Sequence, residues 1–466
     1  MADTATKKHR KFGMLDKVAY GAGDFGCNMS FALKGTLTIF WTQFMGIDQY
    51  VMTVLLLLVQ VWDAINDPVI GAMVDADRRK YKRNKFLQYV WVGSIGLLFA
   101  GALCYVPWQG APAMAKNILF VAGYILWDAF YTIANVPYGS LLSLISADPV
   151  ERAQLSTWRS IGSTLGSVSC QILLPILIYD ASNNLLGDRI FVLALGMGVI
   201  GFIAFQFMIR NTEIRVEREF KVGEEPQKFN IFKAIGNFLR NRPAVGATLA
   251  PVGMFIGMYG AQTALQIMFQ AYFKNARISG IIGMISYVGL ILYMPFIGKI
   301  VKKFGKKEAI TVGSLVSVVA YVLMLVLPIT PDGKGLALFV VCQLINAVGA
   351  GIGTCVSWSL MADAMDYEEW KFGVRNEGTT YAMHSFFRKL AQGIGPSMGL
   401  LFATWLGYNA KLGPDQTAAV ALNMRYLTAG MYLLSAVIQF VAYGLIYNLD
   451  KKTLAKMEHD LGRDKE

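Results

Sequence analysis

Residues 50–74 form an apolar run long enough to cross a membrane as a helix, and two aspartates interrupt it. Asp63 and Asp67 lie four positions apart, so on a helix their carboxylates share one face, about one turn apart. An ionised aspartate in hydrocarbon costs several kcal/mol and two of them repel, so the pair requires a cation, a proton or a water-filled cavity. The sequence therefore predicts a cation site here. The alternative is a buried pair satisfied by a basic residue or by backbone of a neighbouring helix.

Similar apolar segments fill the rest of the chain. Of its 466 residues, 55% are hydrophobic and only 16% charged, which is less charge than a soluble protein of this length carries. The pattern predicts an all-α integral membrane protein with twelve transmembrane helices in two six-helix halves. The expected spans are 15–45, 51–74, 87–107, 116–146, 155–180, 188–210, 243–272, 279–300, 308–329, 335–364, 378–408 and 423–448.

Lys and Arg gather on alternate sides of these spans. Four precede the first span, six follow the second and four follow the eighth, whereas the loops 46–50, 108–115 and 181–187 have none. The positive-inside rule then places both termini in the cytoplasm. The net charge of +12 follows from this topology, so no nucleic-acid partner is expected. No short apolar segment with a small-residue cleavage site follows the polar N-terminus, so no cleaved signal peptide is expected.

A charged stretch, 211–242, divides the spans six and six. It predicts a cytoplasmic linker with one amphipathic helix near 229–240, between an N-terminal half, 1–210, and a C-terminal half, 243–466, with a cytoplasmic tail. The two halves echo each other weakly, since a glycine followed by basic residues closes both the second and the eighth span. Parallel six-helix repeats are typical of secondary transporters whose substrate site lies between the halves.

Two ionisable residues, Asp24 and Lys34, stand at membrane depth in the first span. Asp24 lies among glycines, which favour close helix packing, so it is either a site residue or a packing aspartate bonded to a neighbouring helix. Lys34 lies mid-span, far from either interface, and a salt-bridge role and a substrate role stay equally open.

The fourth and fifth spans carry the next polar group. Asp128, Thr132, Asn135 and Gly139 recur every three or four residues and so share one helix face. In the fifth span, Arg159 beside Trp158 offers a bidentate donor and a stacking face, both suited to sugar hydroxyls. The alternative is that the guanidinium neutralises Asp24 or Asp128.

The eleventh span carries His384 and Arg388 on one face and Lys389 on another, so one of the two basic residues is expected to line the cavity. The preceding segment, 366–371, is predicted to be a loop that forms a cytoplasmic salt-bridge lock between the halves. Glu151 and Arg152 are its candidate partners.

Several motifs resemble the glycoside–pentoside–hexuronide:cation symporters, the branch of the major facilitators that includes the melibiose porter. The resemblance covers nearly the whole chain and rests on Gly23-Asp24-Phe25, Trp62-Asp63-Ala64-Ile65-Asn66-Asp67-Pro68, Asn135-Val136-Pro137-Tyr138-Gly139-Ser140, Glu151-Arg152, and Asp366-Tyr367 to Arg375 with Glu377-Gly378. It implies that Asp63 and Asp67 coordinate the coupling cation, with neutral oxygens from Asn66 and Thr132. An all-oxygen pocket suits a hard cation such as Na⁺.

The same resemblance implies sugar-binding roles for Asp24 and Arg159, and a role for Lys389 in linking the sugar and cation sites. Asn135 and Gly139 stand where melibiose porters have an acidic and an aromatic residue, and they resemble xyloside-, glucuronide- and sulfosugar-type branches instead. The basic residues Lys34, Arg159, His384 and Lys389 make an anionic sugar one candidate. Trp158 and Asp128 complete the expected substrate residues.

The expected function is symport of a sugar or glycoside with Na⁺ or H⁺ across the bacterial inner membrane by a monomer, with no other cofactor. One alternative is a facilitator of the same fold that carries a lipid or drug without cation coupling. A remote alternative is a membrane transferase, but two of the three histidines lie in the tails and no acid/base cluster is evident. The chain is therefore not expected to be an enzyme.

Overall fold

The structure, a computed structural model, describes residues 10–77, 79, 81, 84–146, 149–215, 236, 238–293, 295–373 and 377–461. These residues are largely helical and include no β-strand. Ten of the helices are long and apolar enough to cross a membrane. The predicted helix near 229–240 lies mostly outside the described residues, as does the side chain of Arg152.

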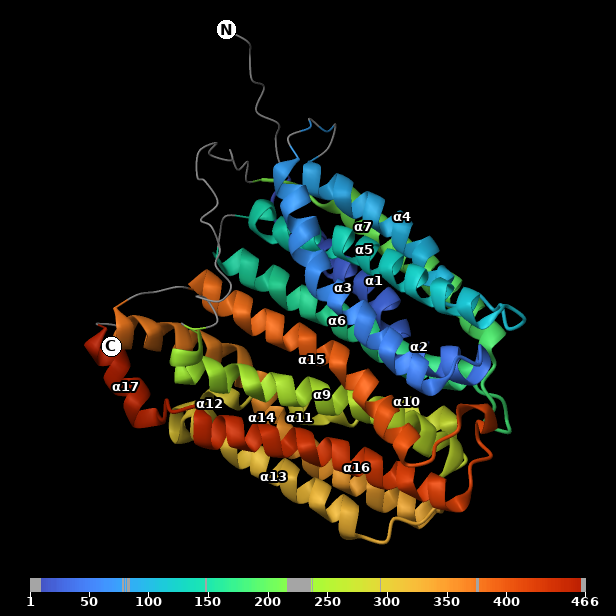
Figure 1. The fold of residues 1–466 in the computed structure, drawn as a ribbon. Helices are drawn as coiled ribbons and strands as arrows, with labels where there is room; N and C mark the ends of the chain where they lie inside the picture. Colours follow the sequence, from blue (N-terminus) through green and yellow to red (C-terminus); the bar gives the residue numbers. More distant parts are fainter. Residues whose placement is uncertain are drawn as a thin grey trace. The chain divides into compact units, whose positions relative to one another are not determined.

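The chain divides into two compact units, each described by itself. The N-terminal unit comprises Met1–Ile47, Val61–Ile178 and Leu185–Glu224. In it, α1 packs against α6 and α7, and α4 packs against α5 and α7 (Figure 1). The elements from α1 to α7 are α1 (Met14–Phe31), η1 (Ala32–Thr36), α2 (Leu37–Ile39), η2 (Phe40–Phe44), α3 (Gln49–Ala76), α4 (Lys85–Leu103), α5 (Ala113–Ile145), α6 (Pro149–Ile178) and α7 (Gly187–Asn211).

The C-terminal unit comprises Glu225–Glu466 together with two short stretches from earlier in the chain, Asp48–Gln60 and Tyr179–Asn184. In this unit α9 packs against α15 and α16, while α14 packs against α11 and α13. Its elements are α9 (Arg242–Ala271), η3 (Ala276–Ile278), α10 (Ser279–Gly283), α11 (Ser286–Tyr293), α12 (Ile297–Phe304), α13 (Lys306–Val326), α14 (Gly333–Phe372), α15 (Glu377–Trp405), η4 (Ala410–Leu412), α16 (Ala418–Val441), η5 (Ala442–Ile446) and α17 (Lys451–Asp460).

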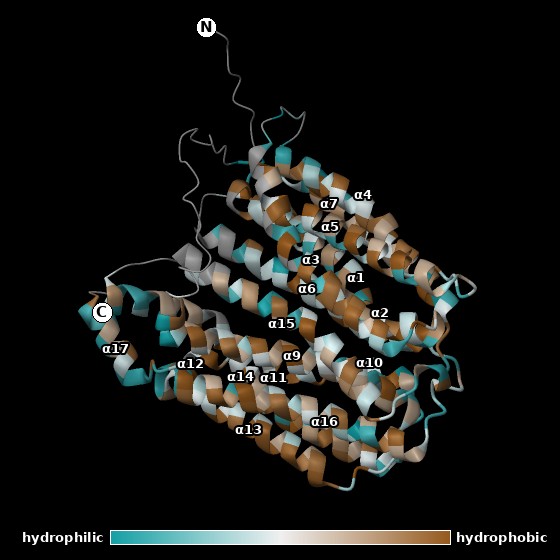
Figure 2. Cartoon of the chain, in the orientation of Figure 1, coloured by the Kyte–Doolittle hydropathy of each residue, from teal (hydrophilic) through white to brown (hydrophobic). Residues whose placement is uncertain are grey.

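Hydrophobic residues predominate along the long helices, and hydrophilic residues are more frequent near the helix ends and in the connections (Figure 2). On α3, Val61, Ile65 and Val69 are each about half exposed and recur at helical spacing, whereas Asn66 and Ile70 on another face are buried. An exposed apolar stripe beside a polar face is the pattern of a helix between lipid and a polar interior. The pattern accounts for how α3 keeps its two aspartates away from hydrocarbon.

The first span departs from the continuous helix expected over 15–45. A 3₁₀ segment, η1, interrupts it at Ala32–Thr36, and a π-helical turn, η2, follows at Phe40–Phe44. The Thr36 hydroxyl donates to the Leu33 carbonyl at 2.8 Å, and the Tyr105 hydroxyl donates to the same carbonyl. These side-chain bonds satisfy a carbonyl at the interruption and stabilise the tighter winding around Lys34.

Two further expectations need correction. The eighth span, expected over 279–300, is broken into α10, α11 and the start of α12, although 276–293 is one of the ten segments long and apolar enough to cross a membrane. The segment 366–371 is not a loop, because α14 runs on to Phe372 and ends at Gly373, whose φ is 67°. Gly373 is the first residue there that readily adopts this left-handed conformation, so the helix has no earlier stop. Glu368 is buried and accepts a hydrogen bond from Thr380 within the same unit.

Candidate functional site

Five polar side chains of α3 and α5 lie together in the N-terminal unit, and we call them the aspartate cluster: Asp63, Asn66, Asp67, Asp128 and Thr132. The Asn66 amide donates to Asp128 Oδ2 and to Thr132 Oγ1, both at 2.9 Å. The Thr132 hydroxyl in turn donates to Asp67 Oδ1 at 2.8 Å. The Asp63 carboxyl lies within hydrogen-bonding reach of Asp128. Neutral side chains thus orient carboxylates from two helices.

Helix geometry explains why these residues meet. On α3, positions 63, 66 and 67 share one face, and on α5 positions 128 and 132 are one turn apart. Asn66, Asp128 and Thr132 are all buried. Thr132 uses its hydroxyl both as acceptor, from Asn66, and as donor, to Asp67, so its hydrogen-bonding capacity is largely used.

A lysine from the first span completes the cluster. Lys34 Nζ lies 3.6 Å from Asp63 Oδ2, and both side chains are about one-fifth exposed. The ammonium also lies over three rings, 5.1 Å from the centre of Tyr124 and 5.6 Å from those of Phe31 and Trp127. Of the two roles left open for Lys34, a salt bridge and a substrate contact, the salt bridge is observed, and its partner is Asp63.

The described contacts of this group join three carboxylates, with the Lys34 ammonium against Asp63. Carboxylates this close repel one another, and a bound proton or cation relieves the repulsion. Among the described residues, no three His, Cys, Asp or Glu side chains converge as a metal site. A monovalent cation held here would therefore need neutral oxygens, such as that of Thr132, in addition to carboxylate oxygens.

A second polar group joins α1 to α6, and we call it the α1–α6 seam. Arg159 Nε donates to Asp24 Oδ1 at 3.2 Å. One turn further along, the Asn28 amide donates to Ser163 Oγ at 3.0 Å and accepts from the Ser167 hydroxyl at 2.8 Å. Residues four apart on each helix thus form successive polar contacts. Asp24 and Arg159 were expected as site residues, whereas Asn28, Ser163 and Ser167 were not.

Glycines allow the two helices to approach closely enough for these contacts. A Cβ atom at Gly162 would lie 1.9 Å from the Gly21 carbonyl oxygen, and one at Gly21 would lie 2.7 Å from the Trp158 carbonyl oxygen. With Gly166, Gly162 forms the small-residue spacing that is typical of close helix pairs in membranes. The distance between α1 and α6 is therefore set by backbone contact.

Arg159 has an aromatic partner on another helix. Its guanidinium lies 5.0 Å from the ring centre of Tyr138 on α5. Tyr138 is fully buried, stacks on Tyr20 and donates to the Tyr20 carbonyl at 2.6 Å. This tyrosine packs against the Arg159 guanidinium, and it was not among the site residues expected from the sequence.

One face of α5 runs from the aspartate cluster to the seam. Beyond Asp128 and Thr132, the Asn135 side-chain oxygen lies 3.8 Å from the sulfur of Cys27 on α1. A Cβ atom at Gly139 would lie 3.8 Å from Arg159 Nη1. The predicted face is therefore observed, and a Cβ atom at Gly139 would be in ordinary van der Waals contact with Arg159.

The basic residues of the eleventh span lie in the C-terminal unit. His384 Nδ1 lies 3.0 Å from the Thr248 hydroxyl of α9, and the imidazole is buried. The Arg388 guanidinium lies 6.0 Å from the ring centre of Phe255. Lys389 is half-buried.

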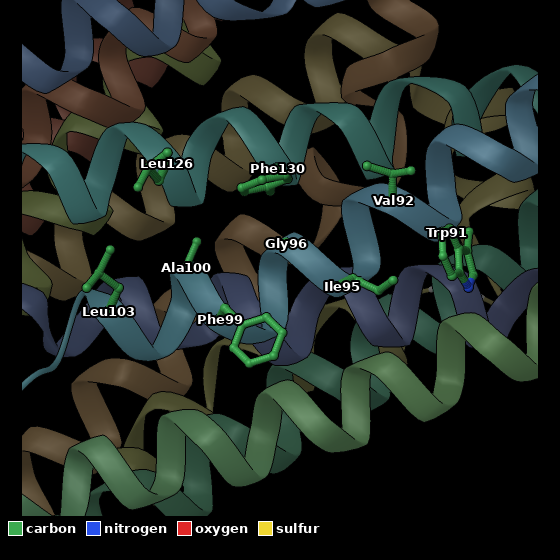
Figure 3. Close-up of a pocket in the computed structure, with 9 residues that line it drawn as sticks. All are labelled: Trp91, Val92, Ile95, Gly96, Phe99, Ala100, Leu103, Leu126 and Phe130. Atoms are coloured by element: carbon green, nitrogen blue, oxygen red, sulfur yellow. The ribbon is translucent and has the colours of Figure 1, made fainter.

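A groove of about 450 Å³ lies elsewhere, between α4 and α5. All nine of its lining residues are non-polar, and they include the exposed Phe99 and Leu126 (Figure 3). A lining without a polar side chain, on helices of a membrane protein, suits lipid chains and not a polar solute. The groove is separate from the polar groups described above.

Comparison with known proteins places this arrangement in a family. Residues 19–451 match the family described as MFS/sugar transport protein. The chain belongs to the MFS/sugar transport family. The resemblance and the fold class predicted from the sequence are both confirmed. Among the described residues, ten helical segments are apolar enough to cross a membrane. The interrupted first span and the charged α15 bring the number to the twelve expected spans.

Curated relatives align with nearly the whole length of this chain. An uncharacterised symporter, YjmB, of Bacillus subtilis (strain 168) is 27% identical over 98% of this chain and 97% of that protein. A putative sulfoquinovose importer of Salmonella typhimurium is 25% identical, over 98% of this chain and 94% of its own length. An isoprimeverose transporter of Lactiplantibacillus pentosus is 27% identical, over 95% and 91%.

Among solved structures, a D-xylose–proton symporter has a TM-score of 0.59 and 14% sequence identity, over 91% of this chain and 96% of that one. The likeness shows that the two proteins share a fold. Because the family consists of membrane transporters, the chain is a multi-pass transporter and not an enzyme, as predicted.

Proposed function

We propose that this transporter is a symporter that couples uptake of a sugar or glycoside to inward flow of Na⁺ or H⁺. The observation that carries the proposal is the aspartate cluster, in which three carboxylates from membrane helices lie together with the oxygens of Asn66 and Thr132. Charges this costly to bury persist in membrane proteins mainly where ions or protons pass. The relatives named as a symporter, a sulfoquinovose importer and an isoprimeverose transporter support a sugar as the co-substrate.

In this proposal Asp63, Asp67, Asn66 and Thr132 hold the coupling cation. Asp128 and Lys34 were candidates for binding the sugar. Because Asp128 belongs to the aspartate cluster and Lys34 contacts Asp63, we assign both to the cation site. When the cation binds, it neutralises part of the cluster and raises sugar affinity. By reciprocal linkage, the sugar raises cation affinity by the same factor.

The sugar would bind along the α1–α6 seam and the adjacent face of α5. Asp24 and Arg159 offer an acceptor and a donor for hydroxyl groups, and Asn135 adds an amide. His384, Lys389 and Trp158 are further candidate ligands. On binding, hydrogen bonds such as the one between Arg159 and Asp24 would be exchanged for hydrogen bonds to the sugar. A sugar with several hydroxyl groups can bond to both side chains, so neither buried charge loses all its hydrogen-bond partners.

The substrate class supported best is a glycoside, pentoside, uronide or sulfosugar. Because residue 139 is glycine, no side chain fills the space beside Arg159 at this position. A ligand group can therefore occupy the position at which melibiose porters have an aromatic side chain. We further propose that the protein is a monomer in the bacterial inner membrane. The distribution of Lys and Arg supports cytoplasmic termini, with halves at 1–210 and 243–466 joined by the linker 211–242. The two halves would alternate access to the substrate.

Uptake into proteoliposomes tests the proposal. A neutral pentoside, a galactoside, a glucuronide and a sulfosugar are each offered with an inward Na⁺ gradient and, separately, an inward H⁺ gradient. We expect accumulation of one sugar above equilibrium under one gradient. Equilibration without accumulation under both gradients would refute symport and leave an uncoupled facilitator.

A further inference from the structure

Lys34 stands where a bound cation would stand. Its ammonium is 3.6 Å from Asp63 Oδ2, and Asp63 is within reach of Asp128. A monovalent cation held by the Asp63 carboxylate would approach the same oxygens. Two positive charges a few ångströms apart repel strongly in a partly dry interior. Lys34 and a soluble cation therefore cannot both occupy Asp63 without a large penalty.

Aromatic rings stabilise the Lys34 ammonium in addition to Asp63. The ring centres of Phe31, Tyr124 and Trp127 all lie within 6 Å of the Nζ atom. Aromatic faces bind ammonium groups through the ring quadrupole, as in cages that recognise methylated lysine. The charge of Lys34 therefore does not depend on Asp63 alone for its stabilisation.

The backbone around Lys34 suits a displacement of its side chain from Asp63. The residue lies on the 3₁₀ segment η1, between α1 and α2, and Gly35 follows it. Short 3₁₀ stretches inside longer helices often mark hinges. Asp24 of the α1–α6 seam lies on α1, ten residues earlier in the same span.

We propose that Lys34 is a tethered competitor for the coupling cation: its ammonium occupies the Asp63 carboxylate in the unloaded protein and must withdraw when a metal cation binds. This inference rests on the cation site of the proposed function. Lys34 is therefore a residue that determines cation affinity and selectivity. The tethered charge lowers the affinity for Na⁺ and Li⁺ and prevents the cluster from retaining them after transport.

Isothermal titration of the purified full-length protein with NaCl and with LiCl, without sugar and at constant ionic strength, measures the competition directly. Lys34→Met removes the charge and keeps most of the apolar volume, so we expect Na⁺ affinity to rise at least tenfold. Lys34→Arg retains the charge, so its affinity should stay within threefold of wild type. Lys17→Met removes a lysine from the first turns of the same span, where its ammonium lies over Phe12, and should change nothing.

The outcomes separate this inference from the proposed function. Saturable Na⁺ binding in wild type, with unchanged or weaker binding in Lys34→Met, overturns the competitor role and leaves the cation site intact. Binding in Lys34→Met but not in wild type supports the inference, because the competition is then complete. Absence of binding in both overturns the two proposals together. If Lys34→Met is not recovered as a folded protein, Lys34→Gln applies the same test with a shorter polar side chain.

Discussion

Replacing Gly162 with alanine tests whether backbone contact between α1 and α6 sets the geometry of the proposed sugar site. The new Cβ atom would lie 1.9 Å from the Gly21 carbonyl oxygen, whereas carbon and oxygen in close contact stay about 3.3 Å apart. The obstacle is backbone, so no side chain can turn away to relieve it. The helices must then separate by about 1.4 Å at this point.

Such a separation acts on binding more than on stability. Overpacking costs about 1–3 kcal/mol, but alanine recovers about 1 kcal/mol of helix propensity, so the net loss of unfolding free energy is about 0–2 kcal/mol. The Asn28–Ser163 bond of 3.0 Å and the Arg159–Asp24 bond of 3.2 Å would both lengthen beyond hydrogen-bonding distance. We expect sugar affinity to fall at least tenfold.

The assay is equilibrium binding of the sugar that wild type accumulates, together with Na⁺ titration and thermal unfolding. Na⁺ affinity measured without sugar should be preserved, because the aspartate cluster lies on α3 and α5. Gly196→Ala in α7 is the matched control, since a Cβ atom there meets nothing within 4 Å. Sugar affinity within twofold of wild type in Gly162→Ala would refute the reasoning.

Three other substitutions test separate parts of the structure. Asp67→Asn removes the charge that accepts from Thr132 at 2.8 Å, so accumulation driven by a cation gradient should disappear while sugar exchange survives; proteoliposomes that still accumulate sugar would contradict the assignment. Arg425→Met removes a buried guanidinium that donates to carbonyls at the end of α13, so unfolding free energy should fall by about 2–3 kcal/mol with cation affinity unchanged, and an unshifted thermal midpoint would argue against that role. Asp77→Ala removes the acceptor of the Tyr81 hydroxyl in the loop after α3, where this bond lowers the pKa of Asp77 to about 2. A lowered pKa means that the contact is fully present above about pH 4 and lost toward pH 2, so at pH 8 trypsin should cut after Arg79 faster in the variant, and equal rates would show that the contact does not hold Tyr81 in place.

The importance of Asp63 and Asp67 could be recognised from the sequence, because a charge at membrane depth is conspicuous. Two aspartates one turn apart inside an apolar run had few explanations, and the structure groups them with Asn66 and Thr132 through α5. The partner of Asp63 was not predictable. Lys34 could have reached several acidic groups or a substrate, and only the path of the first span decides which.

Contacts between helices leave little local signal in the sequence. The ring over the Arg159 guanidinium comes from Tyr138 on α5, more than twenty residues away in the chain, so the sequence around Arg159 does not indicate it. The interruption at η1 contains no proline. It depends on the Tyr105 hydroxyl, which reaches the Leu33 carbonyl from α4's C-terminal end, and such tertiary contacts leave no local signal.

The glycine contact between α1 and α6 separates two tasks that usually conflict when a transporter acquires a new substrate. Because backbone atoms alone hold the two helices together at Gly21 and Gly162, the side chains at Asn28, Ser163 and Ser167 do not have to carry the packing. Those three positions can be exchanged for other small polar residues while the scaffold keeps its spacing. Libraries that vary them and leave the glycines fixed should yield altered sugar preferences in proteins that still fold, which makes this helix pair the natural starting point for redesigning what the transporter carries.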